Sequence, residues 1–120
     1  MANEATVVVT LAFEKGNISR VSKTSGSVSR TVTGSAYVAN VQSVGTAIEA
    51  LVLGDVGTPG LCLLHNLDGT NYVELFANST ASACLKLLAG DWQLVRFGTT
   101  TPNVKANTAT CQLEYFLLDS

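Results

Sequence analysis

The chain has 120 residues, of which 47% are apolar and only 13% are charged, and its formal net charge is −2. This length fits one domain that can bury a core without disulfide support. The small negative charge disfavours nucleic acid as a partner, and the chain lacks the run of about 18 apolar residues that predicts a membrane span.

The amino-terminal third begins with a strand pattern and continues into a Ser/Thr-rich zone. Alternation predicts a first strand over Val7–Phe13 with one strongly apolar face. Lys15–Asn17 reads as a turn. In the zone from Ile18 to Thr33, valines stand among serines and threonines, and Thr24–Ser27 predicts a hairpin tip or an open loop.

Two segments follow before the middle of the chain. Small and β-branched residues predict a strand from Ala36 to about Val44. Thr46–Leu53 fits either a short helix or a strand, and we expect a strand because Gly45 and Gly54 leave room for only about two helical turns.

The run Gly60–Phe76 carries the strongest local signal. Two apolar segments flank an Asn-Leu-Asp-Gly-Thr-Asn turn over Asn66–Asn71, and Asp-Gly between such segments is typical of an antiparallel hairpin. We expect Gly69 to adopt a positive φ, and Asn66, Asp68 and Asn71 to bond nearby backbone as structural turn residues.

The remaining strand signals recur at the spacing of an all-β sandwich. Strands are expected over Ala83–Leu88, Trp92–Phe97 and Thr110–Leu118, with loops at Asp55–Gly60, Asn78–Ser82, Ala89–Asp91 and Thr99–Asn103. The residues expected to be largely buried are Val9, Leu11, Leu63, Leu75, Leu94, Leu113 and Tyr115.

The predicted fold is therefore all-β: a single antiparallel β-sandwich or jelly-roll-like domain of about eight or nine strands. It covers residues 1–120, with 15–35 as a Ser/Thr-rich projecting hairpin or arm. No repeat or linker pattern indicates a second domain.

Cysteine usage and the start of the chain favour a cytoplasmic origin. Cys62, Cys84 and Cys111 are odd in number, far apart and within apolar runs, so we expect them to be reduced, buried and unbridged. Met1–Thr6 has no basic segment typical of a signal peptide.

Catalytic and metal-binding patterns are weak. His65 is the only histidine, and one imidazole does not make an acid–base site, so we expect no enzyme activity and no cofactor. Cys62 and His65 point to opposite faces of a strand, which disfavours zinc. Asp55, Asp68 and Asp91 do not match a calcium loop, so no metal site is expected.

One charge asymmetry stands out. Lys15, Arg20, Lys23 and Arg30 lie in a stretch with no acid from Lys15 until Glu49, together with eleven serines and threonines, while the rest of the chain is acidic. One interpretation is an arm that binds an acidic neighbour through these four cations. The other is a solvated edge hairpin whose charges prevent aggregation.

Four segments carry a resemblance to small β-sandwich structural proteins of tailed-phage virions: Gly54–Gly60, Asn66–Glu74, Leu87–Trp92 and Lys105–Tyr115. They correspond to that group's N-L-D-x-T-N hairpin with the glycine turn before it, its L-x-x-G-[DE] turn and its K-A-N-T-A-x-C-x-L-E-Y closing strand. The similarity runs from about Val44 to the carboxyl terminus, and the first 43 residues match no pattern of the group.

The resemblance implies a capsid decoration (cement) protein, or a tail, collar or fibre-base component. It implies assembly in the host cytoplasm, a place in the virion, the major capsid protein or another virion protein as partner, and a homo-oligomer, with a trimer favoured. A lectin-like module for host attachment is the alternative, with Tyr37, Tyr72 and Trp92 as platforms for a glycan.

Overall fold

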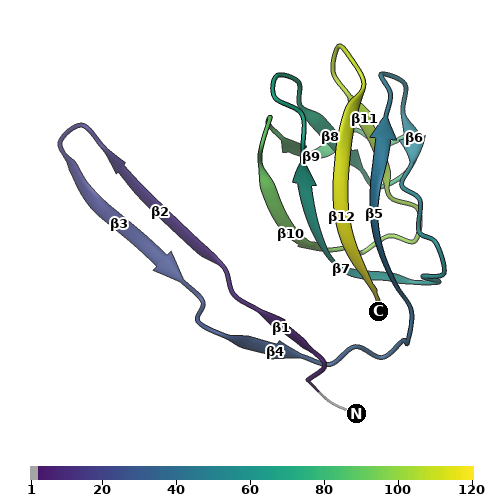
Figure 1. The fold of residues 1–120 in the computed structure, drawn as a ribbon, viewed down its shortest axis with the longest axis horizontal. Helices are drawn as coiled ribbons and strands as arrows, with labels where there is room; N and C mark the ends of the chain where they lie inside the picture. Colours follow the sequence, from purple (N-terminus) through teal and green to yellow (C-terminus); the bar gives the residue numbers. More distant parts are fainter. Residues whose placement is uncertain (1–2) are drawn as a thin grey trace. The chain divides into compact units, whose positions relative to one another are not determined.

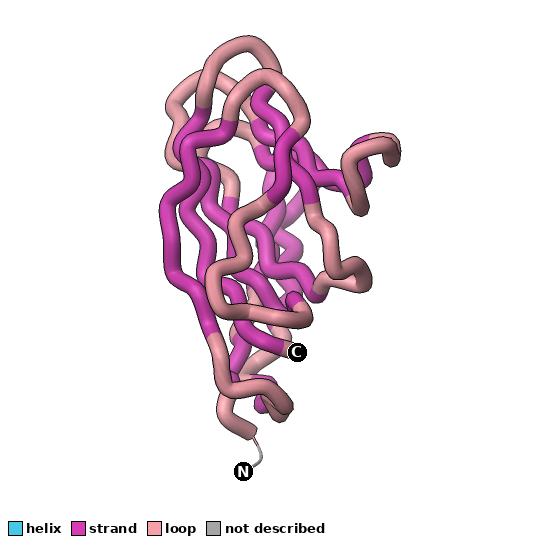
Figure 2. The backbone as a smooth tube through the Cα atoms, turned by 90° about the vertical axis from the view of Figure 1, so that its right-hand side faces the viewer, coloured by secondary structure: helices cyan, strands magenta, loops and turns pink. Residues whose placement is uncertain are grey.

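A computed structural model describes residues 3–120, and these residues form strands and loops with no helix (Figure 2). None of them belongs to a helix long and apolar enough to cross a bilayer. Contacts divide the chain into two compact units, which meet in sequence between Thr33 and Gly34. We had expected one domain with a hairpin over 15–35; the first unit extends from the amino terminus to Thr33.

The first unit, here called the arm (described from residue 3 to residue 33), is a long two-stranded ribbon. Its outer part pairs β2 (Thr10–Lys15) with β3 (Ile18–Thr24), and its base pairs β1 (Ala5–Val7) with β4 (Val28–Arg30), both antiparallel (Figure 1). The ribbon turns at Gly16, whose φ of 56° requires the freedom of a glycine. Thr24–Ser27 is therefore an open connection between β3 and β4, and the hairpin tip lies at Gly16.

The second unit is a sandwich of two four-stranded antiparallel sheets. The first sheet has the order β10-β7-β12-β5, and the second has the order β6-β11-β8-β9 (Figure 1). The strands of the first sheet are β5 (Tyr37–Val44), β7 (Pro59–Asn66), β10 (Trp92–Arg96) and β12 (Cys111–Asp119). The strands of the second are β6 (Glu49–Ala50), β8 (Val73–Phe76), β9 (Ala83–Leu87) and β11 (Asn103–Ala106).

The core lies between the two sheets. On β12 the side chains alternate, so that Cys111, Leu113, Tyr115 and Leu117 face inward and are fully or almost fully buried. They meet apolar side chains from both sheets, among them Leu64, Val73, Leu75, Leu87 and Val104. Leu75, Leu113 and Tyr115 are thus core residues, as their apolar alternation predicts.

Four of the expected core residues are exposed. Val9 and Leu11 lie in the arm, where a single two-stranded layer has no second sheet to cover it. Leu63 and Leu94 lie on the outside of the first sheet, because β7 and β10 are apolar on both faces and only one face turns to the core. The prediction was wrong for the first pair because the arm has no buried face, and for the second pair because the other face of the sheet is the buried one.

The Asn66–Asn71 segment is a loop and does not close a hairpin. β7 pairs with β10 and β12, while β8 pairs with β9 and β11, so the loop carries the chain from one sheet to the other. Gly69 has no positive φ; apart from Gly16, the positive-φ glycines are Gly26, Gly54 and Gly90. The prediction failed because the Asp68 carboxylate, which accepts backbone hydrogen bonds, organises the turn without a left-handed residue.

Strand number and boundaries differ in part from the expectation. The described residues form twelve strands, because the arm contributes four short ones and β11 lies in a segment where no strand was expected. Thr46–Leu53 contains only the two-residue strand β6. The expected strands near β5, β9, β10 and β12 are present within one or two residues of their predicted ends.

Candidate functional site

The arm has an apolar face with nothing packed on it from its own unit. Leu11 pairs with Lys23 and Phe13 pairs with Val21, and directly opposed residues share a face of the ribbon. Leu11, Phe13, Val21 and Lys23 are called the arm face below. Its apolar members are strongly exposed, with Leu11 at 75% and Val21 at 60%. A two-stranded hairpin is marginally stable alone, so such a face is typical of a segment that packs on another surface.

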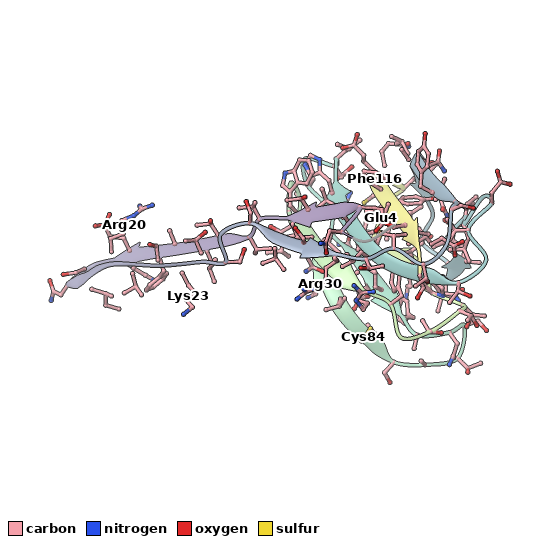
Figure 3. The ribbon with its side chains drawn as sticks, turned by 90° about the horizontal axis from the view of Figure 1, so that it is seen from below. Glu4, Arg20, Lys23, Arg30, Cys84 and Phe116 are labelled. Atoms are coloured by element: carbon pink, nitrogen blue, oxygen red, sulfur yellow. The ribbon has the colours of Figure 1, made fainter. Side chains whose placement is uncertain are left out.

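The four cations predicted to bind a partner all lie in the arm. Lys15 is the last residue of β2, and Arg30 is the last residue of β4. The Arg30 Nη1 donates a hydrogen bond to the Ser29 carbonyl at 3.0 Å. Figure 3 shows Arg20 and Lys23 leaving the ribbon on opposite sides. In the part of the chain that the structure describes, neither of these two makes an ion pair. The arm therefore gathers the cations without placing them on one face.

The second exposed apolar surface is the outer face of the first sheet. Strand register places Trp92, His65, Glu114 and Val41 in one row across the four strands. The next row contains Leu94, Leu63, Phe116 and Ala39. These two rows are called the outer face below. Trp92 is 58% exposed and Phe116 is 49% exposed, which is unusual for side chains of this size.

The outer surface of the other sheet has the opposite character. Its register places Lys105, Glu74 and Lys86 side by side on β11, β8 and β9. The Lys86 ammonium also lies 4.3 Å from the centre of the Tyr72 ring. Alternating charges of this kind are typical of a solvated surface. The contrast makes the outer face of the first sheet the candidate binding surface of the sandwich.

An open groove of about 380 Å³ lies on the outer face. The rings of His65 and Trp92 stack at one side of it, with centroids 3.8 Å apart and an angle of 9° between their planes. The His65 Nδ1 lies 3.4 Å from the Glu114 Oε1. The groove thus combines aromatic and apolar walls with one carboxylate and one imidazole, which suits recognition of a mixed apolar and polar surface.

The predicted turn residues have a hydrogen-bonding role in the structure. The Asp68 Oδ2 accepts from the amides of Thr70 and Asn71 at 2.9 and 2.6 Å, and these bonds lower the pKa of the carboxyl group. The buried Asn66 amide donates to the Asn71 carbonyl at 2.9 Å and to the Leu87 carbonyl at 3.2 Å. Gly69 makes no contact that a side chain would disturb. The loop thus fastens the two sheets together at one end.

The three cysteines are free thiols. Burial raises the pKa of Cys62 to about 12 and also raises the pKa of Cys111, which keeps both thiols protonated. Cys84 is exposed on β9, so the expectation that all three are buried was wrong for this residue, which lies on the outside of the second sheet. Among the described residues, no three His, Cys, Asp or Glu side chains are grouped to hold a metal ion.

Charge alone located the arm in the sequence, whereas of the outer face only Trp92 was predicted to bind a ligand, as a glycan platform. Leu63, Leu94 and Phe116 follow the same alternation as core residues, and only strand register shows that they are neighbours. The available signal was that β7 is apolar at odd and even positions alike, as in Leu63-Leu64, and that an apolar Phe116 follows Tyr115 on β12. A strand with two apolar faces indicates burial on both sides. In a sandwich of two sheets, each sheet is covered on one face only.

No protein-family model matches this chain, and no curated protein or solved structure matches it either.

Proposed function

We propose that this chain is a structural protein of a tailed-phage virion, of the capsid decoration (cement) type. It binds the outer surface of the head as a symmetric oligomer and stabilises the shell. The observation that carries the proposal is the arm face: an apolar ribbon without a core of its own is suited to assembly on another protein surface. The resemblance of residues 44–120 to virion sandwiches supplies the setting.

The proposed mechanism is multivalent binding. Each copy contributes a ribbon with four cations, whose individual rim contacts are worth about 0–1 kcal/mol. Several arms held in one closed oligomer act at high effective concentration, so weak contacts add up to firm attachment. The major capsid protein is the proposed partner, and the same construction would serve a tail, collar or fibre-base position.

The test measures occupancy on purified empty heads, together with the temperature at which the heads open. We expect binding of the wild-type chain to raise that temperature. The variant Arg20→Glu/Lys23→Glu changes two arm cations and should reduce occupancy at least about tenfold through repulsion. The matched control is Lys86→Glu/Lys105→Glu, which changes two cations of the second sheet and should bind like the wild type. Failure of the wild-type chain to bind heads, or equal loss in both variants, would contradict the proposal.

A second candidate is a carbohydrate-binding module for host attachment. The specific observation in its favour is the groove with the exposed, stacked Trp92 beside Glu114, because sugars stack on aromatic faces and bond to carboxylates. A glycan array discriminates between the two functions. Saturable sugar binding that Trp92→Ala abolishes would favour attachment over decoration.

A further inference from the structure

We propose that the arm face of one copy packs on the outer face of a second copy, so that the copies assemble by exchanging arms. This inference deepens the proposed function, since it names how the oligomer forms. It is tested in solution without heads, so its failure and that of head binding are distinguishable.

The arm face and the outer face have matching patterns of charged and apolar rows. The arm face has a row with one charge, Leu11 beside Lys23, and an apolar row, Phe13 beside Val21. The outer face repeats this arrangement, with Glu114 in one row and Leu63 beside Phe116 in the next. Same-face rows of a strand are about 7 Å apart in both, since each spans two residues. A face-to-face packing therefore places apolar row on apolar row and Lys23 near Glu114.

The two units also have complementary net charges. The arm has four cations against Glu4 and Glu14, a net charge of +2, and the sandwich has three cations against seven carboxylates, a net charge of −4. The positively charged arm of one copy is thus attracted to the negatively charged sandwich of another copy. Because each copy offers one arm face and one outer face, every surface finds a partner in a head-to-tail ring. This closure is consistent with the symmetric oligomer of the proposed function.

Both surfaces are apolar and lack a layer that covers them. The hairpin lacks a second layer, and the first sheet has Trp92, Leu63, Leu94 and Phe116 on the side away from its core. Packing one on the other adds a third apolar layer and removes both exposed faces from water. The second sheet, with Lys105, Glu74 and Lys86 across its strands, does not offer an apolar row for the arm.

The test measures the mass of the full chain by sedimentation equilibrium over a range of concentrations. We expect a closed oligomer for the wild type and a dissociation constant at least about tenfold higher for Lys23→Glu, because this change brings two carboxylates together at the interface. Arg20→Glu is the matched comparison: it changes the net charge of the arm equally but lies on the opposite face of the ribbon, so it should weaken assembly by less than about threefold. Circular dichroism verifies that each variant retains its strands.

A charge exchange identifies the partner residue. Glu114→Lys alone should weaken assembly as Lys23→Glu does, and an equimolar mixture of the two single variants should regain the wild-type mass by pairing unlike copies. A wild-type chain that remains monomeric would overturn the inference. This holds equally for a monomer whose arm is covered by its own sandwich. Equal effects of Lys23→Glu and Arg20→Glu, or a mixture that stays dissociated, would overturn it as well.

Discussion

The imidazole of His65 and the indole of Trp92 lie face to face on neighbouring strands, 3.8 Å between centroids, at one side of the groove on the outer face. On the next strand, the Glu114 Oε1 lies 3.4 Å from the His65 Nδ1. The stack holds the two rings in one relative orientation. A surface that is ordered in advance loses less entropy when a partner binds to it.

This stack predicts a shielded environment for the single tryptophan of the chain. The His65 ring covers one face of the Trp92 indole, and its removal opens that face to water. We expect His65→Ala to shift the tryptophan emission of the dissociated chain to longer wavelength. An emission spectrum equal to that of the wild type would show that the stack does not persist in solution.

The two faces of the first sheet predict unequal costs for one substitution. Leu113 is fully buried between the sheets, so Leu113→Ala should lower the free energy of unfolding by about 2–5 kcal/mol through lost burial and a cavity. Leu63 lies on the outer face and is 38% exposed, so Leu63→Ala should cost markedly less in the dissociated chain. Urea unfolding at low protein concentration measures both. Equal costs would mean that the outer face is buried even in the single chain.

Two glycines predict a similar contrast for backbone conformation. Gly90 has a φ of 81° in the turn before β10, where an added Cβ is strained, so Gly90→Ala should destabilise by about 1 kcal/mol. Gly69 has no positive φ and open space around it, so Gly69→Ala should leave stability unchanged or slightly raised. Thermal melts of the two variants suffice. A larger loss of stability for Gly69→Ala than for Gly90→Ala would favour the hairpin predicted from the sequence over the loop in the structure.

The Asp68 turn predicts a pH-dependent contribution to stability. Its hydrogen bonds to the amides of Asn71 and Thr70 lower the carboxyl pKa below the ordinary value of 3.8. The contribution is therefore fully present above that value and is lost as the pH falls through the lowered pKa of the folded state. Comparing urea midpoints at neutral and strongly acidic pH, we expect Asp68→Asn to lose less stability on acidification than the wild type. Identical losses would show that Asp68 makes no such contribution.

Local chemistry made part of this structure predictable. Small and β-branched residues located β5, alternation located β12, and the Gly-Asp turn before Trp92 located the start of β10. Strand pairing was not readable in the same way, because Asp-Gly between two apolar segments predicts a hairpin whether or not the segments belong to one sheet. The Asn66 amide, which reaches the Leu87 carbonyl across 21 residues of sequence, shows that the decisive contacts were distant.

The two candidate surfaces differ in the same way: the cations of the arm could be predicted from the sequence, whereas the outer face could not. The cations of the arm are close in sequence, so composition alone revealed them. The outer face is assembled from β5, β7, β10 and β12, and its residues become neighbours only through the register of four strands. Apolar residues that belong to an interface and those that belong to a core follow the same period, and only the position of the second layer distinguishes them.

Amide hydrogen exchange of the arm tests the central claim of this account most directly. A two-stranded ribbon with an uncovered apolar face opens readily, and its amides exchange quickly. We predict that the amides of β2 and β3 become protected as the concentration of the chain rises, and that Lys23→Glu abolishes this protection. Arm amides that exchange rapidly at every concentration, and on phage heads as well, would contradict the claim that the arm works by packing on another protein surface.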